Sequence, residues 1–395
     1  MRRHFPRWLV SSLSVVLSLS LQLIGGLYTS SMSRMRSCMV IYPRTSICLL
    51  LLAFLHLPSD HDSALFLRRG SAGITVLLLY VDDMTITGDD ASGISELQAH
   101  LHRHFEKSLG PLRYFLGLKI SDTSGVYYLS QPKYASDLLS SAGLTDFKTA
   151  PTPLDSDYHL TPMDGVPLDD PTLYRQLVGS LIYLTVTRPD IAYAIHIVSQ
   201  FMSAPRTTHH STVIRILRYI KGTFLHGLHY SARSSLVLTG YSDVNWAGDP
   251  SDHRSTTRFC FFLGDSLISW RNKKQTVVSR SSAESEYRAL ADTTAELLWL
   301  RWFLADLGVP QSSATIIHCD SQSSMKISTN DVFHEYTKHI EIDCHIVRYH
   351  VTYGNISLSP ISSADQTADG FTKPHLPSRF QSFLSKLKLG STVPP

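Results

Sequence analysis

Four acidic residues in the C-terminal half of the chain stand where a fold could bring carboxylates together. Asp243 ends one apolar stretch, "LVLTGYSD", and Asp320 ends another, "ATIIHCD". Glu286 lies in the first turns of a long helical pattern, and Asp369 stands near the start of a short helix in "TADGFTKP". Each residue alone has a structural explanation, because turns and helix starts favour acidic side chains. Four of them at converging positions of one fold predict a shared site.

The chemistry that needs several carboxylates at one place is phosphodiester hydrolysis by two metal ions. Mg²⁺ prefers oxygen ligands and keeps several waters. Two such ions, about 3.5–4 Å apart, activate a water and stabilise the leaving oxygen. Holding two divalent cations so close together requires several negative ligands. We therefore expect Asp243, Glu286, Asp320 and Asp369 to bind two Mg²⁺ ions, with Mn²⁺ as a substitute.

A second acidic pair, Asp82 and Asp83, lies in "ITVLLLYVDDMTITGDD". The apolar runs Ile74–Tyr80 and Met84–Thr87 predict two strands around a tight turn. Adjacent carboxylates at the tip of a hairpin are a plausible metal seat, but two are rarely enough to hold an ion.

The elements that must position the C-terminal carboxylates are predicted by the hydrophobic pattern. Residues 236–243, 257–263 and 266–270 are predicted strands, and a long helix is expected over 282–307 before a buried strand at 314–320. This order predicts a mixed sheet with helices on its faces.

A Pro-rich linker, Thr149–Asp157, precedes a helical stretch. Helices are expected over 174–185, from Pro189 onward, and over about 208–221. No Asp or Glu occurs between Ile191 and Ser242, which favours a phosphate-binding surface over an ordinary solvated helix face. The candidate residues there are Arg215, Arg218 and Lys221.

A second basic cluster lies in "SWRNKKQTVVSR", beside the helix that carries Glu286. Its members are candidates for phosphate contact, although cations also protect an exposed strand edge. They are Arg271, Lys273, Lys274 and Arg280. Tryptophans in this half are predicted to be core residues rather than base-stacking platforms. They are Trp246, Trp270, Trp299 and Trp302.

Composition adds bounds. At 395 residues the chain can hold two or three domains, and a net charge of +3 requires any basic surface to be local. The five cysteines form no CxxC pair, so neither a disulfide framework nor a zinc module is indicated. The apolar runs 8–28 and 47–57 favour either a signal or membrane anchor, or a leader unrelated to the domains behind it.

The ordered motifs resemble those of a copia-type LTR retrotransposon Pol polyprotein, in its C-terminal part, over about Pro58 to Pro374. They are "LLLYVDDMTITGDD", "LRYFLGLKI", "YRQLVGSLIYLTVTRPDIAYAI", "RILRYIKGT", "GYSDVNWAGDPSDHRSTT", "SLISWRNKKQTVVSRSSAESEYRAL", "HCDSQSS", "FHEYTKHIEIDCHIVR" and "ADGFTKP". The resemblance implies an α+β and α/β chain: a truncated polymerase palm and thumb-like part, then an RNase H-like mixed sheet flanked by helices.

By position, the resemblance implies that Asp243, Glu286, Asp320 and Asp369 are RNase H metal ligands, and that Asp82 and Asp83 are two of three polymerase carboxylates. Two departures bear on activity. Residues 1–57 contain no Asp or Glu, so we expect the third polymerase carboxylate, and polymerase activity, to be lost. Gly370, where the family usually has a larger apolar residue, is expected to loosen the segment that presents Asp369.

The sequence thus predicts an apolar leader, a partial palm, a helical connection, an RNase H-like domain and a C-terminal tail, at 1–57, 58–150, 151–233, 234–376 and 377–395. The expected function is Mg²⁺-dependent cleavage of the RNA strand of RNA/DNA hybrids. The alternative is a non-catalytic relic that at most binds nucleic acid. Expected partners are an RNA/DNA hybrid and a separate chain carrying the missing polymerase part. A cytoplasmic or nuclear location is favoured over a membrane.

Overall fold

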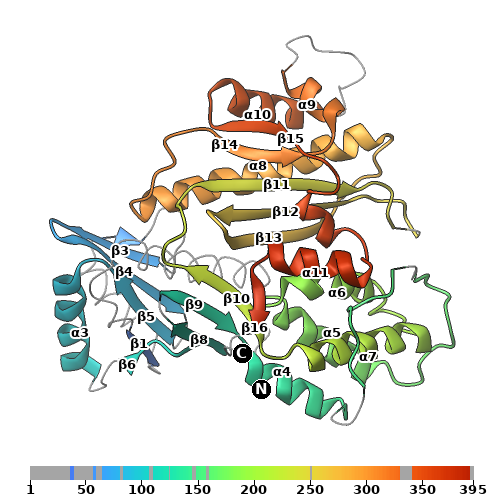
Figure 1. The fold of residues 1–395 in the computed structure, drawn as a ribbon, viewed down its shortest axis with the longest axis horizontal. Coiled ribbons are helices and arrows are strands. Elements are labelled where there is room, and N and C mark those ends of the chain that lie inside the picture. Colours follow the sequence, from blue (N-terminus) through green and yellow to red (C-terminus); the bar gives the residue numbers. More distant parts are fainter. Residues whose placement is uncertain are drawn as a thin grey trace.

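The computed structural model describes residues 36–39, 57–58, 65–80, 83–105, 110–123, 125–144, 148–156, 160–249, 251–329 and 340–391. Within these ranges the chain is a mixed α/β protein with three sheets (Figure 1). None of the helices in the described part is long and apolar enough to cross a membrane. The apolar run 8–28 lies outside the described residues, and of the run 47–57 only Leu57 lies within them.

The first sheet contains the predicted acidic hairpin. Its order is β2 (Leu57–Pro58), β3 (Leu65–Gly70), β4 (Gly73–Tyr80), β5 (Asp83–Gly88), β1 (Arg36–Met39) and β6 (Gly110–Pro111). Strands β4 and β5 are antiparallel and pair Tyr80 with Asp83, which confirms the hairpin. Asp82 lies outside the described residues, and the structure describes only the backbone of Asp83.

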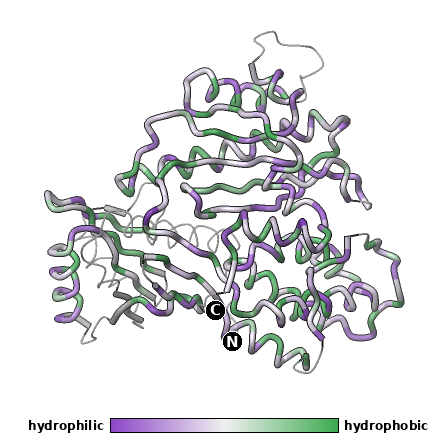
Figure 2. The backbone as a smooth tube through the Cα atoms, in the orientation of Figure 1, coloured by the Kyte–Doolittle hydropathy of each residue, from purple (hydrophilic) through white to green (hydrophobic). Residues whose placement is uncertain are grey.

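Helix α3 (Ala91–Phe105) packs against this sheet through residues at helical spacing. Ile94, Leu97 and Leu101 are buried. Figure 2 shows hydrophobic and hydrophilic residues alternating along the helix, the pattern of a helix with one face on a core.

Strand β1 corrects the prediction that residues 1–57 form a leader separate from the fold. Arg36–Met39 pairs antiparallel with β5 and with β6, inside the first sheet. The strand covers four residues, "RSCM", with neither strict alternation nor an apolar run. A strand this short carries too little periodicity to be recognised.

The second sheet joins distant parts of the chain. Its order is β16 (Leu389–Ser391), β10 (His226–Ser231), β9 (Val126–Ser130), β8 (Leu118–Thr123) and β7 (Tyr114–Phe115). Strand β10 pairs with β9 on one side and with β16 on the other. Residues 377–391, which the sequence analysis left as a tail, form α11 (Pro377–Lys386) and β16, and Phe380, Phe383 and Leu384 of that helix are buried.

The predicted helical stretch is present. After the linker it consists of α5 (Thr172–Leu184), η1 (Pro189–Ile191), α6 (Ala192–Ser199) and α7 (Thr207–Gly222), while the short helix α4 (Pro132–Ser141) precedes the linker. Pro189 opens η1, since a proline in the first turn removes no intrahelical hydrogen bond. Helices α5, α6 and α7 pack on one another through an apolar core that includes Leu177, Leu181 and Ile216.

The third sheet has the predicted mixed topology. Its order is β13 (Ser266–Lys274), β12 (Thr256–Leu263), β11 (Leu238–Asn245), β14 (Thr315–Cys319) and β15 (Ile356–Pro360). The first three are antiparallel neighbours, whereas β14 runs parallel to β11 and β15 parallel to β14. Helices α8 (Ser282–Asp306), α9 (Gln322–Thr329) and α10 (Glu341–Thr352) lie together on one side of this sheet (Figure 1).

Candidate metal centre

Asp243 and Asp320 lie at the same end of two parallel neighbouring strands. The register of β11 and β14 pairs Tyr241 with His318. Asp243 and Asp320 each stand two residues further along the chain, so both lie beyond that pair in the same direction. Ligand sites of α/β sheets gather at the carboxyl ends of parallel strands.

Glu286 joins these strand ends from helix α8. One ligand atom each from Glu286, Cys319 and Asp320 lies within 4.8 Å of the others, close enough to share one cation. After burial, repulsion from Asp243 is the next cause of the raised pKa of Glu286, so the Asp243 carboxylate lies near this group. The structure thus brings Glu286 and Asp320 to one place, with Asp243 near enough to contribute to the raised pKa of Glu286. Cys319 is an addition that the sequence did not indicate.

The start of α8 is fixed by its own sequence. The Ser281 side chain caps the helix by accepting a hydrogen bond from the Glu284 backbone N–H at 3.2 Å. The Glu284 carboxylate in turn accepts from the Arg280 backbone N–H at 2.9 Å. Ser281 and Glu284 have the S-x-x-E spacing of a capping box, but Glu284 bonds the backbone of the residue before the cap instead of the cap itself. Beyond Glu286, Thr293 Oγ1 donates to Ser242 Oγ at 2.9 Å and ties the helix to β11. Glu286 is therefore presented by a helix anchored at both sides of it.

Two of the carboxylates are buried and have raised pKa values. Burial, followed by repulsion from Asp243 and Asp320, raises the pKa of Glu286 to about 9. Burial, followed by repulsion from Asp369 and Asp320, raises the pKa of Asp243 to about 7. The Glu286 Oε2 atom is buried and has no hydrogen-bond partner. A divalent cation would offset the repulsion and give Oε2 a partner, so these residues fit a metal ion.

Arg258 is the charged neighbour that sequence reasoning missed. It faces Asp243 from the adjacent strand β12, is 1% exposed, and leaves its Nε and one terminal nitrogen unpartnered. Its guanidinium carbon lies 5.0 Å from the centre of the Tyr193 ring, a cation–π distance. Burial lowers the pKa of Arg258 to about 10, and its charge opposes the rise in the pKa of Asp243. Inside the pattern "TTRFCFFL" nothing marked this arginine as more than a strand residue.

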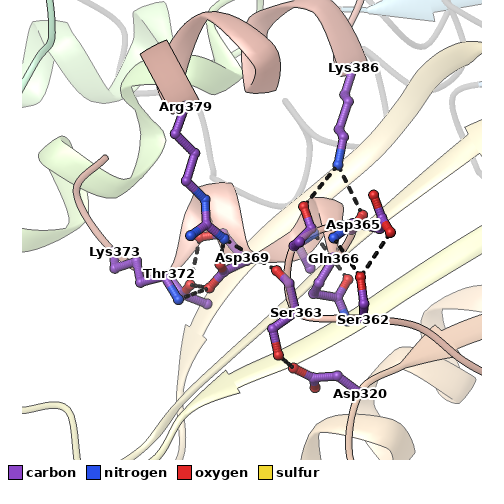
Figure 3. A network of polar contacts seen from close by, with 12 residues as sticks. Asp320, Ser362, Ser363, Asp365, Gln366, Asp369, Thr372, Lys373, Arg379 and Lys386 are labelled. Carbon is purple, nitrogen blue, oxygen red and sulfur yellow. Dashed lines mark hydrogen bonds and ion pairs between the residues drawn. The ribbon is translucent and has the colours of Figure 1, made fainter. Parts of the chain in front are cut away.

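Asp369 has a different environment, because its carboxylate is already paired (Figure 3). It lies in η3 (Thr367–Phe371), and its Oδ1 accepts a hydrogen bond from Thr372 Oγ1 and an ion pair from Lys373 Nζ, both at 2.8 Å. Its Oδ2 accepts from Arg379 at 2.8 Å. The charge of Asp369 therefore contributes to the raised pKa of Asp243, but both oxygens of Asp369 are already paired with cations.

The loop between β15 and η3 connects Asp369 to the other carboxylates (Figure 3). Ser363 Oγ donates to Asp320 Oδ2 at 3.1 Å. Gln366 Nε2 donates to the carbonyl of Ser242, the residue before Asp243, at 2.9 Å. Lys386 of α11 binds two backbone carbonyls of the same loop. Helix α11 and this loop thus hold the carboxylate-bearing segments in register.

Gly370 does not loosen this segment in the way the sequence analysis expected. A Cβ atom at Gly370 would lie 2.0 Å from the Phe383 ring of α11. The aromatic ring fills the space of the missing side chain, and it packs edge-on against Phe371 with centroids 5.2 Å apart. The glycine allows α11 to approach η3 closely.

The basic residues of β13 are engaged with acids of the same fold. Lys273 pairs with Asp292 of α8 at 2.7 Å, and Arg271 lies 3.9 Å from Glu296. Lys274 pairs with Asp249 and Asp252. Strand β13 is at the edge of the sheet, which agrees with edge protection. Arg280 is exposed just before α8.

The basic residues of α7 contact the linker. Arg215 pairs with Asp155 at 2.7 Å, and Arg218 donates to the carbonyl of Lys148 at 2.7 Å. Lys221 is half-buried in the last turn of α7. Arg215 and Arg218 therefore connect α7 to the Pro-rich linker and to the residue before it. Phosphate binding by Arg215, Arg218 and Lys221 stays a prediction.

Two tryptophans differ from expectation. Trp246 is 48% exposed and Trp302 is 52% exposed, so neither is a core residue. Trp246 follows β11 directly and donates from Nε1 to the carbonyl of Ser279, just before α8, at 3.2 Å. Its ring therefore lies beside the strand and helix that carry Asp243 and Glu286.

Known proteins share this order of motifs. A family model described as "Reverse transcriptase (RNA-dependent DNA polymerase)" matches residues 30–156. The match begins inside the segment that the sequence analysis assigned to a leader, in agreement with β1. A solved foamy viral protease–reverse transcriptase dRH in complex with double-stranded DNA aligns with a TM-score of 0.41 and 11% identity, over 73% of this chain and 46% of that one.

The chain is 40% identical over 338 residues to the retrovirus-related Pol polyprotein from transposon RE1 of Arabidopsis thaliana, which covers 85% of this chain and 23% of that protein. It therefore spans less than a quarter of that relative's length. It is 30% identical over 242 residues to a putative transposon Ty5-1 protein of Saccharomyces cerevisiae, covering 60% of this chain and 79% of that protein. The chain belongs to the copia-type retrotransposon Pol polyprotein family and corresponds to a reverse transcriptase-like part of it.

Proposed function

We propose that the C-terminal half of this chain is an RNase H: a Mg²⁺-dependent endonuclease that hydrolyses the RNA strand of RNA/DNA hybrids. The observation that carries the proposal is the meeting of Glu286 and Asp320, whose ligand atoms lie within 4.8 Å of each other and of Cys319, beside Asp243 on the neighbouring strand. These carboxylates come from three elements, meet at one end of a mixed sheet, and leave a buried oxygen of Glu286 without a partner. A buried carboxyl group without a partner is costly, and a cation would supply that partner.

The sheet supports the same assignment. Three antiparallel strands followed by two parallel ones, with α8 packed on β11 and β12, form the scaffold expected of an RNase H-like domain. Two Mg²⁺ ions, held by Asp243, Glu286, Asp320 and Asp369, would activate a water and stabilise the leaving oxygen. Mn²⁺ would serve in their place.

The chain's own residues orient these ligands. The Ser363 hydroxyl fixes one oxygen of Asp320, and the Gln366 amide fixes the strand backbone next to Asp243. Arg258 keeps a positive charge beside Asp243 and favours its ionised form. Partners of this kind hold metal ligands in their binding geometry, and removing them weakens metal binding.

Features around the carboxylates suit a nucleic acid. Trp246 presents an exposed ring next to the strand end, where a base or sugar can stack on it. Arg280, Arg271 and Lys273 are partly or fully exposed on the adjoining strand and helix start. An A-form hybrid offers phosphates and 2′-hydroxyls along a shallow minor groove, which such a surface reads by shape.

The proposal does not extend to DNA synthesis. The role of Asp82 and Asp83, and the loss of polymerase activity, stay predictions. A separate chain carrying the rest of the polymerase is the partner that would restore it.

The test is incubation of the full chain with an end-labelled RNA/DNA hybrid in Mg²⁺, beside Asp320→Asn. We expect internal cuts confined to the RNA strand, absent in EDTA and absent in the variant. Hybrid binding without cleavage by folded wild-type protein would instead establish the alternative, a non-catalytic nucleic-acid-binding relic. That alternative is favoured by one observation, the pairing of Asp369 with two cations.

A further inference from the structure

We propose that Lys373 and Arg379 cover Asp369 while the protein is free of nucleic acid, and exchange that carboxylate for a backbone phosphate of the bound strand. The proposal rests on the nuclease function proposed above and adds to it two phosphate-binding residues and an order of events. It makes Asp369 available to a cation only when a strand is present.

The contacts of Asp369 account for both of its oxygens. Oδ1 accepts a hydrogen bond from Thr372 Oγ1 and forms an ion pair with Lys373 Nζ, and Oδ2 accepts a hydrogen bond from Arg379. The Asp369 carboxylate is itself buried. A cation that approaches it from the side of Asp243 must therefore compete with two ion pairs. Asp243 and Glu286 carry no such pairs, and their raised pKa values reflect this.

The two cations are placed so that they can change partners. The Lys373 side chain is 50% exposed and the Arg379 side chain is 48% exposed, so each has one side in solvent. Lys373 lies one helical turn after Asp369, while Arg379 reaches it from α11 and also donates to the carbonyl of Ser363 at 3.2 Å. Their exposed sides let both cations bind a phosphate, and a metal ion bound by the buried Asp369 carboxylate would replace the positive charge that they remove.

The exchange gives two different cation-binding events. The group of Glu286, Cys319 and Asp320, with Asp243 beside it, has no ion pair within the described part of the chain and takes a cation in the free protein. A cation bound also by Asp369 follows only when a phosphate has drawn Lys373 and Arg379 away. Their charges then neutralise the strand instead of the carboxylate, which couples substrate arrival to completion of the metal centre.

The first measurement is Mn²⁺ binding to the full chain, read from the electron paramagnetic resonance signal of free Mn²⁺. Addition of a hybrid with a 2′-O-methyl RNA strand, which cannot be hydrolysed, should allow the wild type to bind about one more ion. The double variant Lys373→Gln/Arg379→Gln should bind that additional ion without nucleic acid. An equal number of ions in wild type and variant, both without hybrid, would overturn the proposal.

The second measurement is the salt dependence of hybrid affinity, by fluorescence anisotropy. In the double variant Lys373→Gln/Arg379→Gln two phosphate contacts are lost. The magnitude of the slope of log K against log salt should therefore fall by about two, and hybrid affinity should fall about tenfold or more. The charge-preserving double variant Lys373→Arg/Arg379→Lys should keep the wild-type slope, which separates charge from misfolding. Lys388→Gln, which removes a lysine paired with Asp265, is the matched control and should leave the slope unchanged.

The outcomes separate this inference from the nuclease proposal. Cleavage by the wild type with an unchanged slope in the Gln double variant would leave the nuclease and remove the exchange. The expected slopes and ion counts without cleavage would leave the exchange and remove the nuclease. A wild-type chain that binds no hybrid would contradict both.

Discussion

Two buried carboxylate groups in this chain meet opposite conditions. The Asp190 carboxylate accepts two hydrogen bonds from the Arg188 guanidinium, at 2.9 and 2.7 Å, and one from the Tyr219 hydroxyl at 2.6 Å. Arg188 gives its remaining hydrogen bonds to Thr223. Glu286, in contrast, has an oxygen with no partner and two carboxylates as neighbours.

The difference distinguishes a structural acid from a candidate ligand for a cation. A buried ion pair with every hydrogen bond made holds elements together, here η1, α7 and the turn after it. A buried acid left unsatisfied destabilises the fold, and its retention points to a cation. Burial and residue type are shared by both places, so neither property alone identifies a functional carboxylate.

The largest change in stability is expected at the buried ion pair of Arg188 and Asp190. Asp190→Asn leaves Arg188 buried without a counter-charge, so it should destabilise the protein by about 3–5 kcal/mol. Thermal or urea unfolding of the full chain measures this. Mg²⁺ should not restore the loss. A variant as stable as the wild type would show that the pair does not hold the helices together.

At Glu286, removal of the carboxylate charge is expected to stabilise the protein, opposite to the effect at Asp190. The pKa of this group is raised from an ordinary 4.5 to about 9, so the folded chain binds its proton more tightly than the unfolded chain. The metal-free fold therefore loses stability as pH rises above about 4.5, until about 9. Glu286→Gln removes this penalty and should stabilise the protein in EDTA at pH 8 by about 2–3 kcal/mol.

The same linkage predicts an effect of cations on the pH profile. In EDTA the unfolding temperature of the wild type should fall between pH 5 and pH 9, more steeply than that of Glu286→Gln. Saturating Mg²⁺ should flatten the wild-type profile, because a bound cation favours the ionised carboxylates. Parallel profiles for wild type and variant in EDTA would argue against an uncompensated acid.

The smallest effect is expected one contact away from the carboxylates. Ser363→Ala removes the hydrogen bond to Asp320 and leaves the carboxylate in place. Affinity for Mn²⁺ should fall about tenfold, the lower range for loss of a residue that orients a ligand. Ser362→Ala, whose hydroxyl binds Asp365 in the same loop, is the matched control. Equal losses in both variants would indicate a general loosening of the loop.

The sequence predicted most of the third sheet because its signals are local. The apolar strands, the long helix and the acids at strand ends can each be recognised from a short stretch of residues. The convergence of Asp243, Glu286 and Asp320 follows from that order of elements. The difference between these acids and Asp369 does not, since Arg379 reaches Asp369 from a segment expected to be a tail.

The remaining differences have a similar cause. Strands β1 and β16 cover four and three residues, and they are fixed by pairing with β5 and β10, not by their own pattern. Arg258 sits in an apolar strand, where only the packed structure reveals that it is buried beside Asp243. Short strands and single buried charges depend on tertiary contacts that propensity cannot show.

The central claim, that Asp243 and Glu286 are kept buried for a cation, is tested most directly by counting the protons released when Mg²⁺ binds. Calorimetric titration at pH 7 in two buffers of different ionisation enthalpy gives that number. Because the pKa values of these acids are about 7 and about 9, binding should release about one to two protons per protein. Binding with no proton release, or no binding at all, would contradict the account.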